Sequence, residues 1–117
     1  MKKILVPVDG SENSAKAIEK AKSLAELYDS QVTLLYIIND TMISNPYVVR
    51  NDYKAELSTV LSQQGDNILR SSLELFGPNS MRDNIVMKYG DPGNSIISYA
   101  EENDFDLVIM GSRGLNA

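Results

Sequence analysis

Two stretches of this sequence place glycine and polar residues directly after apolar runs, where they could bind an anion or a polar ligand. The longer one is Asp106-Leu-Val-Ile-Met-Gly-Ser-Arg-Gly114, an apolar run that ends in Gly111-x-x-Gly114. Glycines after a buried strand let the backbone turn sharply and expose N–H groups, which suit an anion such as phosphate. Ser112 and Arg113 add a hydroxyl and a guanidinium, both common in anion sites. The same glycines also fit a plain strand-to-loop turn, and their spacing alone favours that second interpretation.

The other stretch is Pro7-Val-Asp-Gly-Ser11, at the end of the apolar run that begins at Ile4. Asp9 at the carboxyl end of a strand could accept hydrogen bonds from a ribose or an adenine. Asp9-Gly10 is also a turn signal, and Ser11 is a good cap for a following helix. These two interpretations are compatible. Neither the dinucleotide fingerprint Gly-x-Gly-x-x-Gly nor a P-loop occurs in the sequence.

The composition excludes several kinds of chemistry. The chain contains no histidine and no cysteine, which rules out Ser-His-Asp and Cys-His catalysis, disulfides and thiolate metal sites. Asp40, Asp91 and Asp104 do not form the dense carboxylate set of an oxygen-ligand metal site, and Asp91 is better explained as a helix cap. We therefore predict no catalytic residue and no metal site built from protein side chains.

Length, charge and hydropathy limit the remaining classes. A chain of 117 residues with 43% hydrophobic residues fits one domain, residues 1–117. The net charge of −5, without a basic cluster, argues against a nucleic-acid partner and against an anionic membrane surface. No stretch approaches the roughly 18 apolar residues of a membrane span, and the first apolar run is too short for a signal peptide. We expect a cytoplasmic protein.

Apolar runs and amphipathic segments alternate along the chain. The runs predict strands at residues 4–8, 32–38, 85–89 and 106–110, and the segments predict helices at 14–28, 53–76 and 91–103. This alternation is typical of a parallel sheet with helices on its faces. In such sheets ligands bind beyond the carboxyl ends of the strands, where the strand order reverses. Both polar stretches lie at such ends.

Several local features complete the pattern. The apolar face of the first helix is predicted at Ala15, Ile18, Ala21, Ala25 and Tyr28. The third helix is predicted to begin with Pro92 and to have an apolar face at Ile96, Ile97 and Ala100. Gly65 is a weak point that could bend the second helix. Residues 39–52 show no periodicity and are predicted to form a long surface loop, and the short run 85–89, which carries Lys88, is predicted to be an edge strand.

In order along the chain, these stretches resemble the universal stress protein family, within the adenine-nucleotide α-hydrolase-like superfamily. The likeness covers the whole chain. It rests on Ile4-Leu-Val-Pro-Val-Asp-Gly-Ser11, Val32-Thr-Leu-Leu-Tyr-Ile-Ile38, Gly90-Asp-Pro92, Tyr99-Ala-Glu-Glu102 and Asp106-Leu-Val-Ile-Met-Gly-Ser-Arg-Gly114. The resemblance implies an α/β fold, a Rossmann-like or flavodoxin-like parallel sheet with strand order 3-2-1-4-5.

The resemblance also implies a ligand. In the ATP-binding branch of the family, the ends of the first, second and fourth strands hold the nucleotide. Pro7, Val8 and Asp9 then correspond to nucleoside contacts, and Ile37 to the position that faces the adenine. The ribose and phosphate side corresponds to Met110, Gly111 and Gly114. Ser112 and Arg113, which lie between the two glycines, are added as candidate nucleotide contacts because of their hydroxyl and guanidinium groups. The implied function is a stress-response regulator that binds ATP, with Mg²⁺ carried by the nucleotide and at most slow hydrolysis.

The family pattern continues beyond the first two glycines to a second Gly-Ser/Thr pair, a last helix and a fifth strand that commonly forms a homodimer contact. Nothing follows Ala117 here, so we expect a C-terminally shortened domain with strand order 3-2-1-4 and an exposed fourth strand. The missing pair favours an alternative, a nucleotide-free stress-response module that acts through dimerisation. A phospho-receiver domain is less favoured, because the third strand ends Met87-Lys88-Tyr89 without an acceptor aspartate.

Overall fold

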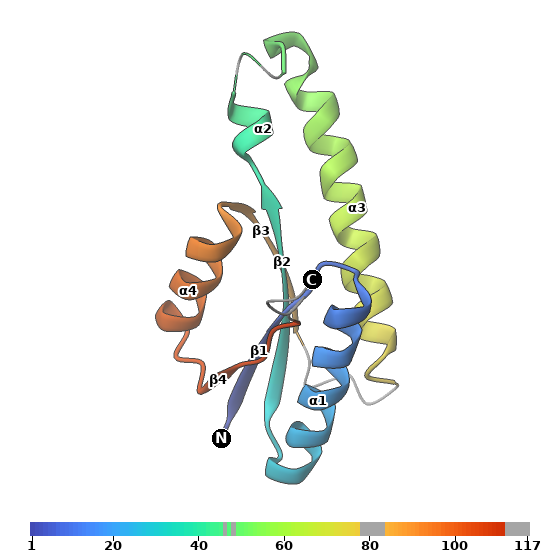
Figure 1. The fold of residues 1–117 in the computed structure, drawn as a ribbon, viewed down its shortest axis with the longest axis vertical. Helices are drawn as coiled ribbons and strands as arrows, with labels where there is room; N and C mark the ends of the chain where they lie inside the picture. Colours follow the sequence, from blue (N-terminus) through green and yellow to red (C-terminus); the bar gives the residue numbers. More distant parts are fainter. Residues whose placement is uncertain (46, 48, 78–83, 112–117) are drawn as a thin grey trace, which may run out of the picture.

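The computed structural model describes residues 1–45, 47, 49–77 and 84–111, which form an α/β structure (Figure 1). Its elements in chain order are β1 Lys3–Pro7, α1 Glu12–Tyr28, β2 Gln31–Asn39, α2 Thr41–Ser44, the short 3-10 helix η1 Asn51–Tyr53, α3 Lys54–Glu74, β3 Asn84–Gly90, α4 Pro92–Glu102 and β4 Leu107–Val108. The predicted strands and long helices are all present. The fourth strand is shorter than the predicted run 106–110.

The described strands form one parallel sheet in the order β3-β2-β1-β4, as predicted. Each step from β1 to β2 and from β2 to β3 passes through a helix, which is the connection that parallel strands require. Strand β3 lies at one edge, as predicted, and β4 pairs with β1 at the other. Within the described sheet, β1 and β2 are therefore the two central strands, and their ends lie beside each other.

Helices cover both faces of the sheet, so the prediction on this point is confirmed. Figure 1 shows α1 and α3 on one side of the strands and α4 on the other. Successive side chains of β1 alternate between these layers: Ile4 and Val6 pack in the cluster with α1 and α3, whereas Leu5 packs with Ile96 of α4. All three β1 side chains are fully buried, because each contacts a helix layer on its own face.

Helix α1 begins where the sequence predicts a cap, but it buries a slightly different face. The Ser11 hydroxyl accepts a hydrogen bond from the N–H of Ser14 at 3.1 Å. The buried residues are Ser14, Ala17, Ile18 and Ala21. The prediction that Tyr28 belongs to the buried face was wrong, since its side chain is 53% exposed at the end of the helix.

Gly65 packs closely against the sheet instead of interrupting α3. The helix runs without a break through this buried residue. A Cβ at position 65 would lie 2.7 Å from the sulfur of Met87 and 2.8 Å from the ring of Tyr36. Any larger residue would push α3 away from β2 and β3, so Gly65 sets how closely the helix approaches the sheet.

Two further expectations need correction. The segment 39–52 is not an unstructured loop throughout, because it contains α2 and the start of η1; its residues 46 and 48 lie outside the described part of the chain. In α4, only one of two adjacent isoleucines is in the core: Ile96 is buried, whereas Ile97 is 59% exposed. Asp91 caps this helix by accepting the N–H of Asn94 at 3.1 Å, as predicted.

Candidate functional site

The strand order reverses between β1 and β4. The chain steps from β1 to β2 to β3 and then returns, through α4, to place β4 on the opposite side of β1. This is the point at which open α/β sheets bind ligands, beyond the carboxyl ends of their strands. A cavity of about 340 Å³ lies here, a volume within the range of small-molecule sites. We call it the switch-point cavity.

Three groups of residues line the switch-point cavity. The end of β1 and the turn after it contribute Pro7, Val8, Asp9 and Ser14, the end of β2 contributes Leu35, Tyr36 and Ile37, and α4 and the segment after β4 contribute Pro92, Ile96, Met110 and Gly111. Six of the nine residues predicted to bind the nucleotide are among them. The other three, Ser112, Arg113 and Gly114, lie outside the described residues. The structure thus brings the six together, and their role in binding stays a prediction.

The turn after β1 is held by its own hydrogen bonds. The N–H of Asp9 donates to the Ser14 hydroxyl at 3.3 Å, and the Asp9 carboxylate accepts the N–H of Ser11 at 2.9 Å. Gly10 takes a φ of 83°, which glycine adopts without strain. The turn-and-cap interpretation of this stretch is therefore correct. It leaves room for a ligand, because the carboxylate is exposed and can accept several hydrogen bonds.

Gly111 lets the segment after β4 lie against the first turn of α1. A Cβ at this position would come within 2.5 Å of the backbone carbon and oxygen of Asn13 and 2.7 Å of the nitrogen of Ser14. These are backbone atoms, which cannot rotate away as a side chain can. Close packing against α1 therefore explains why position 111 is a glycine. It also fixes the distance between two walls of the switch-point cavity.

The lining is mostly apolar, with polar groups at one side. Among the described lining residues Asp9 is the sole charged one. Proline, branched aliphatic and methionine side chains make up most of the rest, and such walls favour a flat apolar ring. Helices α1 and α4 both begin near this edge of the sheet, and helix N-termini favour anions. The arrangement suits a ligand with a planar ring at one end and polar groups at the other.

Sequence reasoning missed five of the lining residues, and most had a signal. Leu35 and Tyr36 directly precede the expected Ile37 on the same strand. The ligand-binding part of this strand therefore begins two residues earlier than the sequence predicted. Pro92 and Ile96 were identified as the start and apolar face of a helix without being linked to the cavity. Ser14 was missed because a small polar residue adds nothing to an apolar periodicity, although it is 3% exposed.

The described residues offer no protein-built metal centre. No group of three or more side chains of the types that bind metals is placed to hold an ion among residues 1–45, 47, 49–77 and 84–111. In the same residues, no helix is long and apolar enough to cross a membrane.

The topology and the switch-point cavity together define a flavodoxin-like α/β protein. The sequence model of the Universal stress protein family matches residues 1–117. The chain therefore belongs to the universal stress protein family, as its resemblance indicated.

Individual members show the same likeness. The chain is 34% identical over 114 residues to a universal stress protein of Methanothermobacter thermautotrophicus, a match that covers 95% of this chain and 75% of that protein. Universal stress protein UspA from Lactobacillus plantarum matches in structure with a TM-score of 0.81 at 24% identity, over 99% of this chain and 80% of the other. A universal stress protein in complex with cAMP matches with a TM-score of 0.66 at 19% identity, over 92% and 74%. At these identities the two structures establish the fold alone.

The relatives are longer than this chain. The chain spans 65% of the length of the universal stress protein MJ0531 of Methanocaldococcus jannaschii, to which it is 30% identical. What the longer relatives bind or assemble with therefore does not transfer by similarity alone.

Proposed function

We propose that this chain is a stress-response regulator that binds an adenine nucleotide, ATP, at the carboxyl ends of β1, β2 and β4. One observation carries the proposal: residues from these three strand ends surround a single cavity of about 340 Å³ at the reversal of strand order. Six of them are the residues that the family resemblance assigns to the nucleotide. The size is that of a small-molecule site.

The adenine would lie between apolar walls, with Ile37 and Val8 on the β-strand side and Met110 on the other. The Asp9 carboxylate is the group suited to accept hydrogen bonds from the ribose hydroxyls or the adenine amine. The phosphates would extend toward Gly111, since glycine-rich turns after a strand are suited to phosphate binding through backbone N–H groups. Mg²⁺ would arrive with the nucleotide, coordinated mainly by phosphate and water.

A family member solved in complex with cAMP supports the class of ligand, since cAMP is an adenine nucleotide. Its identity of 19% means that it supports the class and no individual contact. We propose cytoplasmic location and homodimer formation on the family resemblance. Hydrolysis is at most slow in this proposal, because Asp9 is the one carboxylate among the described lining residues.

A second function is favoured by the charge of the site. The chain has a net charge of −5, and no lysine or arginine is among the described residues that line the cavity. Phosphate groups would therefore rely on backbone donors. This observation favours the alternative, a nucleotide-free interaction module that acts through dimerisation.

Isothermal titration calorimetry with Mg·ATP and with Mg·GTP separates the two functions. The proposal predicts saturable ATP binding with a dissociation constant at or below about 1 mM, within the common range of small-ligand affinities. GTP should bind more weakly, because the family resemblance assigns the apolar walls of the cavity to an adenine ring. Mass spectrometry of a denatured extract tests for copurified nucleotide. Absence of heat at millimolar ATP, together with no copurified nucleotide and a stable dimer, would support the interaction module instead.

A further inference from the structure

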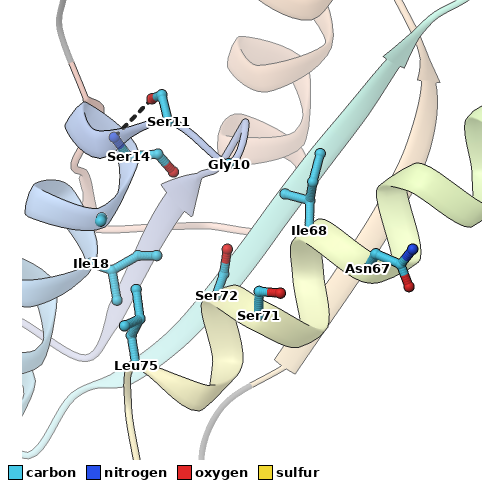
Figure 2. Close-up of a pocket in the computed structure, with 10 residues that line it drawn as sticks. Gly10, Ser11, Ser14, Ile18, Asn67, Ile68, Ser71, Ser72 and Leu75 are labelled. Atoms are coloured by element: carbon cyan, nitrogen blue, oxygen red, sulfur yellow. Dashed lines mark hydrogen bonds between the residues drawn. The ribbon is translucent and has the colours of Figure 1, made fainter.

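A second cavity of about 360 Å³ lies between α1 and α3 (Figure 2). We call it the α1–α3 cleft. Ile18 of α1 and Ile68 and Leu75 of α3 give it apolar walls, and Ser14, Ser72 and Asn67 bring polar groups to it. Figure 2 shows the two helices facing each other across this space, with the Ser11–Ser14 cap at one end. None of the six described residues that were predicted to bind the nucleotide lines it.

Ser72 is the informative residue of the α1–α3 cleft. Ser72 as a whole is only 6% exposed, and Figure 2 shows its hydroxyl pointing into the space between the helices. Helical serines commonly donate to the carbonyl four residues earlier, as Ser23 does to Glu19 at 3.2 Å. Within the described part of the chain, the Ser72 hydroxyl makes no hydrogen bond of this or any other kind. Because no buried side-chain oxygen among the described residues lacks a partner, this hydroxyl is reached from the cleft, where a ligand group or water can pair with it.

The charge of the cleft limits what it can take. Every described lining residue is uncharged. An ion entering this space would lose hydration without meeting a side chain of opposite charge among the described lining residues, which is unfavourable. The apolar walls reward burial of a hydrocarbon body, and the serines and Asn67 supply both donors and acceptors. Its volume is in the range of small-molecule sites.

We propose that the α1–α3 cleft is a second ligand site, one that binds an uncharged small molecule with an apolar body and a hydroxyl or carbonyl group that pairs with Ser72. This site is distinct from the switch-point cavity, although Ser14 lines both. The inference does not rest on nucleotide binding, and its test is done without nucleotide.

The probe is cyclohexanol, titrated into the ¹⁵N-labelled chain and followed by two-dimensional amide NMR. We expect saturable shifts concentrated at Ile18, Ile68 and Ser72, with a millimolar dissociation constant that is reasonable for a ligand of this size. Cyclohexylamine, a cation at neutral pH, and cyclohexanecarboxylate have the same ring with a charge, and should bind at least about tenfold more weakly. Equal shifts with all three probes, or no saturable shift at the three amides with about 50 mM cyclohexanol, would refute the proposal.

A matched pair of variants tests the hydrogen bond. Ser72→Ala removes the hydroxyl that opens onto the cleft and should weaken cyclohexanol binding about three- to tenfold, the range expected for one neutral hydrogen bond. Ser23→Ala removes an exposed serine hydroxyl of α1, which donates to the Glu19 carbonyl and does not line the cleft, and should leave affinity unchanged. Amide spectra of both free variants report whether the fold is retained. Retained affinity in a folded Ser72→Ala, or equal loss in both variants, would overturn the assignment of Ser72.

Discussion

Replacing Gly111 with alanine tests whether the contact between the end of β4 and α1 holds the switch-point cavity in shape. A Cβ there would lie 2.5 Å from the backbone of Asn13, whereas carbon atoms in contact normally lie about 3.5–4.0 Å apart. The two segments must therefore separate by about 1 Å. The first turn of α1 is fixed by the Ser11 cap and the buried Ser14, so we expect the segment after β4 to move, and Met110 with it.

The magnitude follows from the cost of overpacking, typically about 1–3 kcal/mol. If the strain appears in the free protein, Gly111→Ala lowers the free energy of unfolding by about this amount. If the segment after β4 moves instead, the same energy appears as weaker ATP binding, about 5- to 150-fold at 1.4 kcal/mol per tenfold. Urea unfolding and ATP calorimetry on one preparation measure both parts.

Gly93→Ala is the matched control for this substitution. Gly93 lies in the first turn of α4, and its added Cβ would meet nothing closer than an Asp91 carboxylate oxygen at 3.8 Å. It should leave stability unchanged or raise it by up to about 1 kcal/mol, because alanine is a better helix former. Unchanged stability together with unchanged ATP affinity in Gly111→Ala would refute the role assigned to this glycine.

Four further substitutions or additions test other parts of the structure. Gly65→Ala should destabilise by about 1–2 kcal/mol in urea unfolding, since overpacking against Tyr36 and Met87 exceeds the gain in helix propensity; a stabilised variant would contradict the packing role. Asp9→Asn should retain the Ser11 contact and the fold but weaken ATP binding about three- to tenfold in calorimetry; unchanged affinity would remove Asp9 from the site. Asp106→Asn should be less stable than the parent at neutral pH, because N–H groups of Lys3 and then Lys2 donate to the Asp106 carboxylate and hold its pKa below its ordinary value. That stabilisation is present above the unfolded pKa and is lost as pH falls through the folded one, so urea midpoints of the two proteins should converge below about pH 4 and not above it. Saturating cyclohexanol should change the ATP dissociation constant, and ATP should change that of cyclohexanol by the same factor; an ATP dissociation constant that stays the same with saturating cyclohexanol would refute the coupling.

The order of strands and helices was predictable because the apolar runs are separated by clear helix signals. Runs such as Ile4-Leu-Val are buried on both faces of a parallel sheet, and this produces an unbroken hydrophobic pattern in sequence. The caps Ser11 and Asp91 were predictable for a local reason, since each hydrogen bond joins residues three apart. Local chemistry was enough at these positions.

The details that failed depend on packing between elements far apart in sequence. Gly65 looks like a weak point in an isolated helix, and only the positions of Tyr36 and Met87 explain why nothing larger fits. Ile96 and Ile97 are equivalent in a sequence pattern, yet one is in the core and the other is mostly exposed. In the candidate site, too, some residues could be predicted from the order of the elements and others depended on how distant elements pack. Residues at strand ends could be predicted from topology, whereas Ser14 required the position of α1 on the sheet.

The turn from Asp9 to Ser14 connects the two cavities physically. Ser14 lines both, its hydroxyl accepts the Asp9 N–H, and its own N–H is held by Ser11. On the side of the α1–α3 cleft, a Cβ at Gly10 would contact the Ile68 side chain at 3.3 Å, so the turn is packed tightly against α3. A ligand that moves α1 relative to α3 would therefore shift the same turn that carries the Asp9 carboxylate. Linkage requires that such coupling be reciprocal, which makes the start of α1 the element through which an uncharged ligand could regulate nucleotide binding.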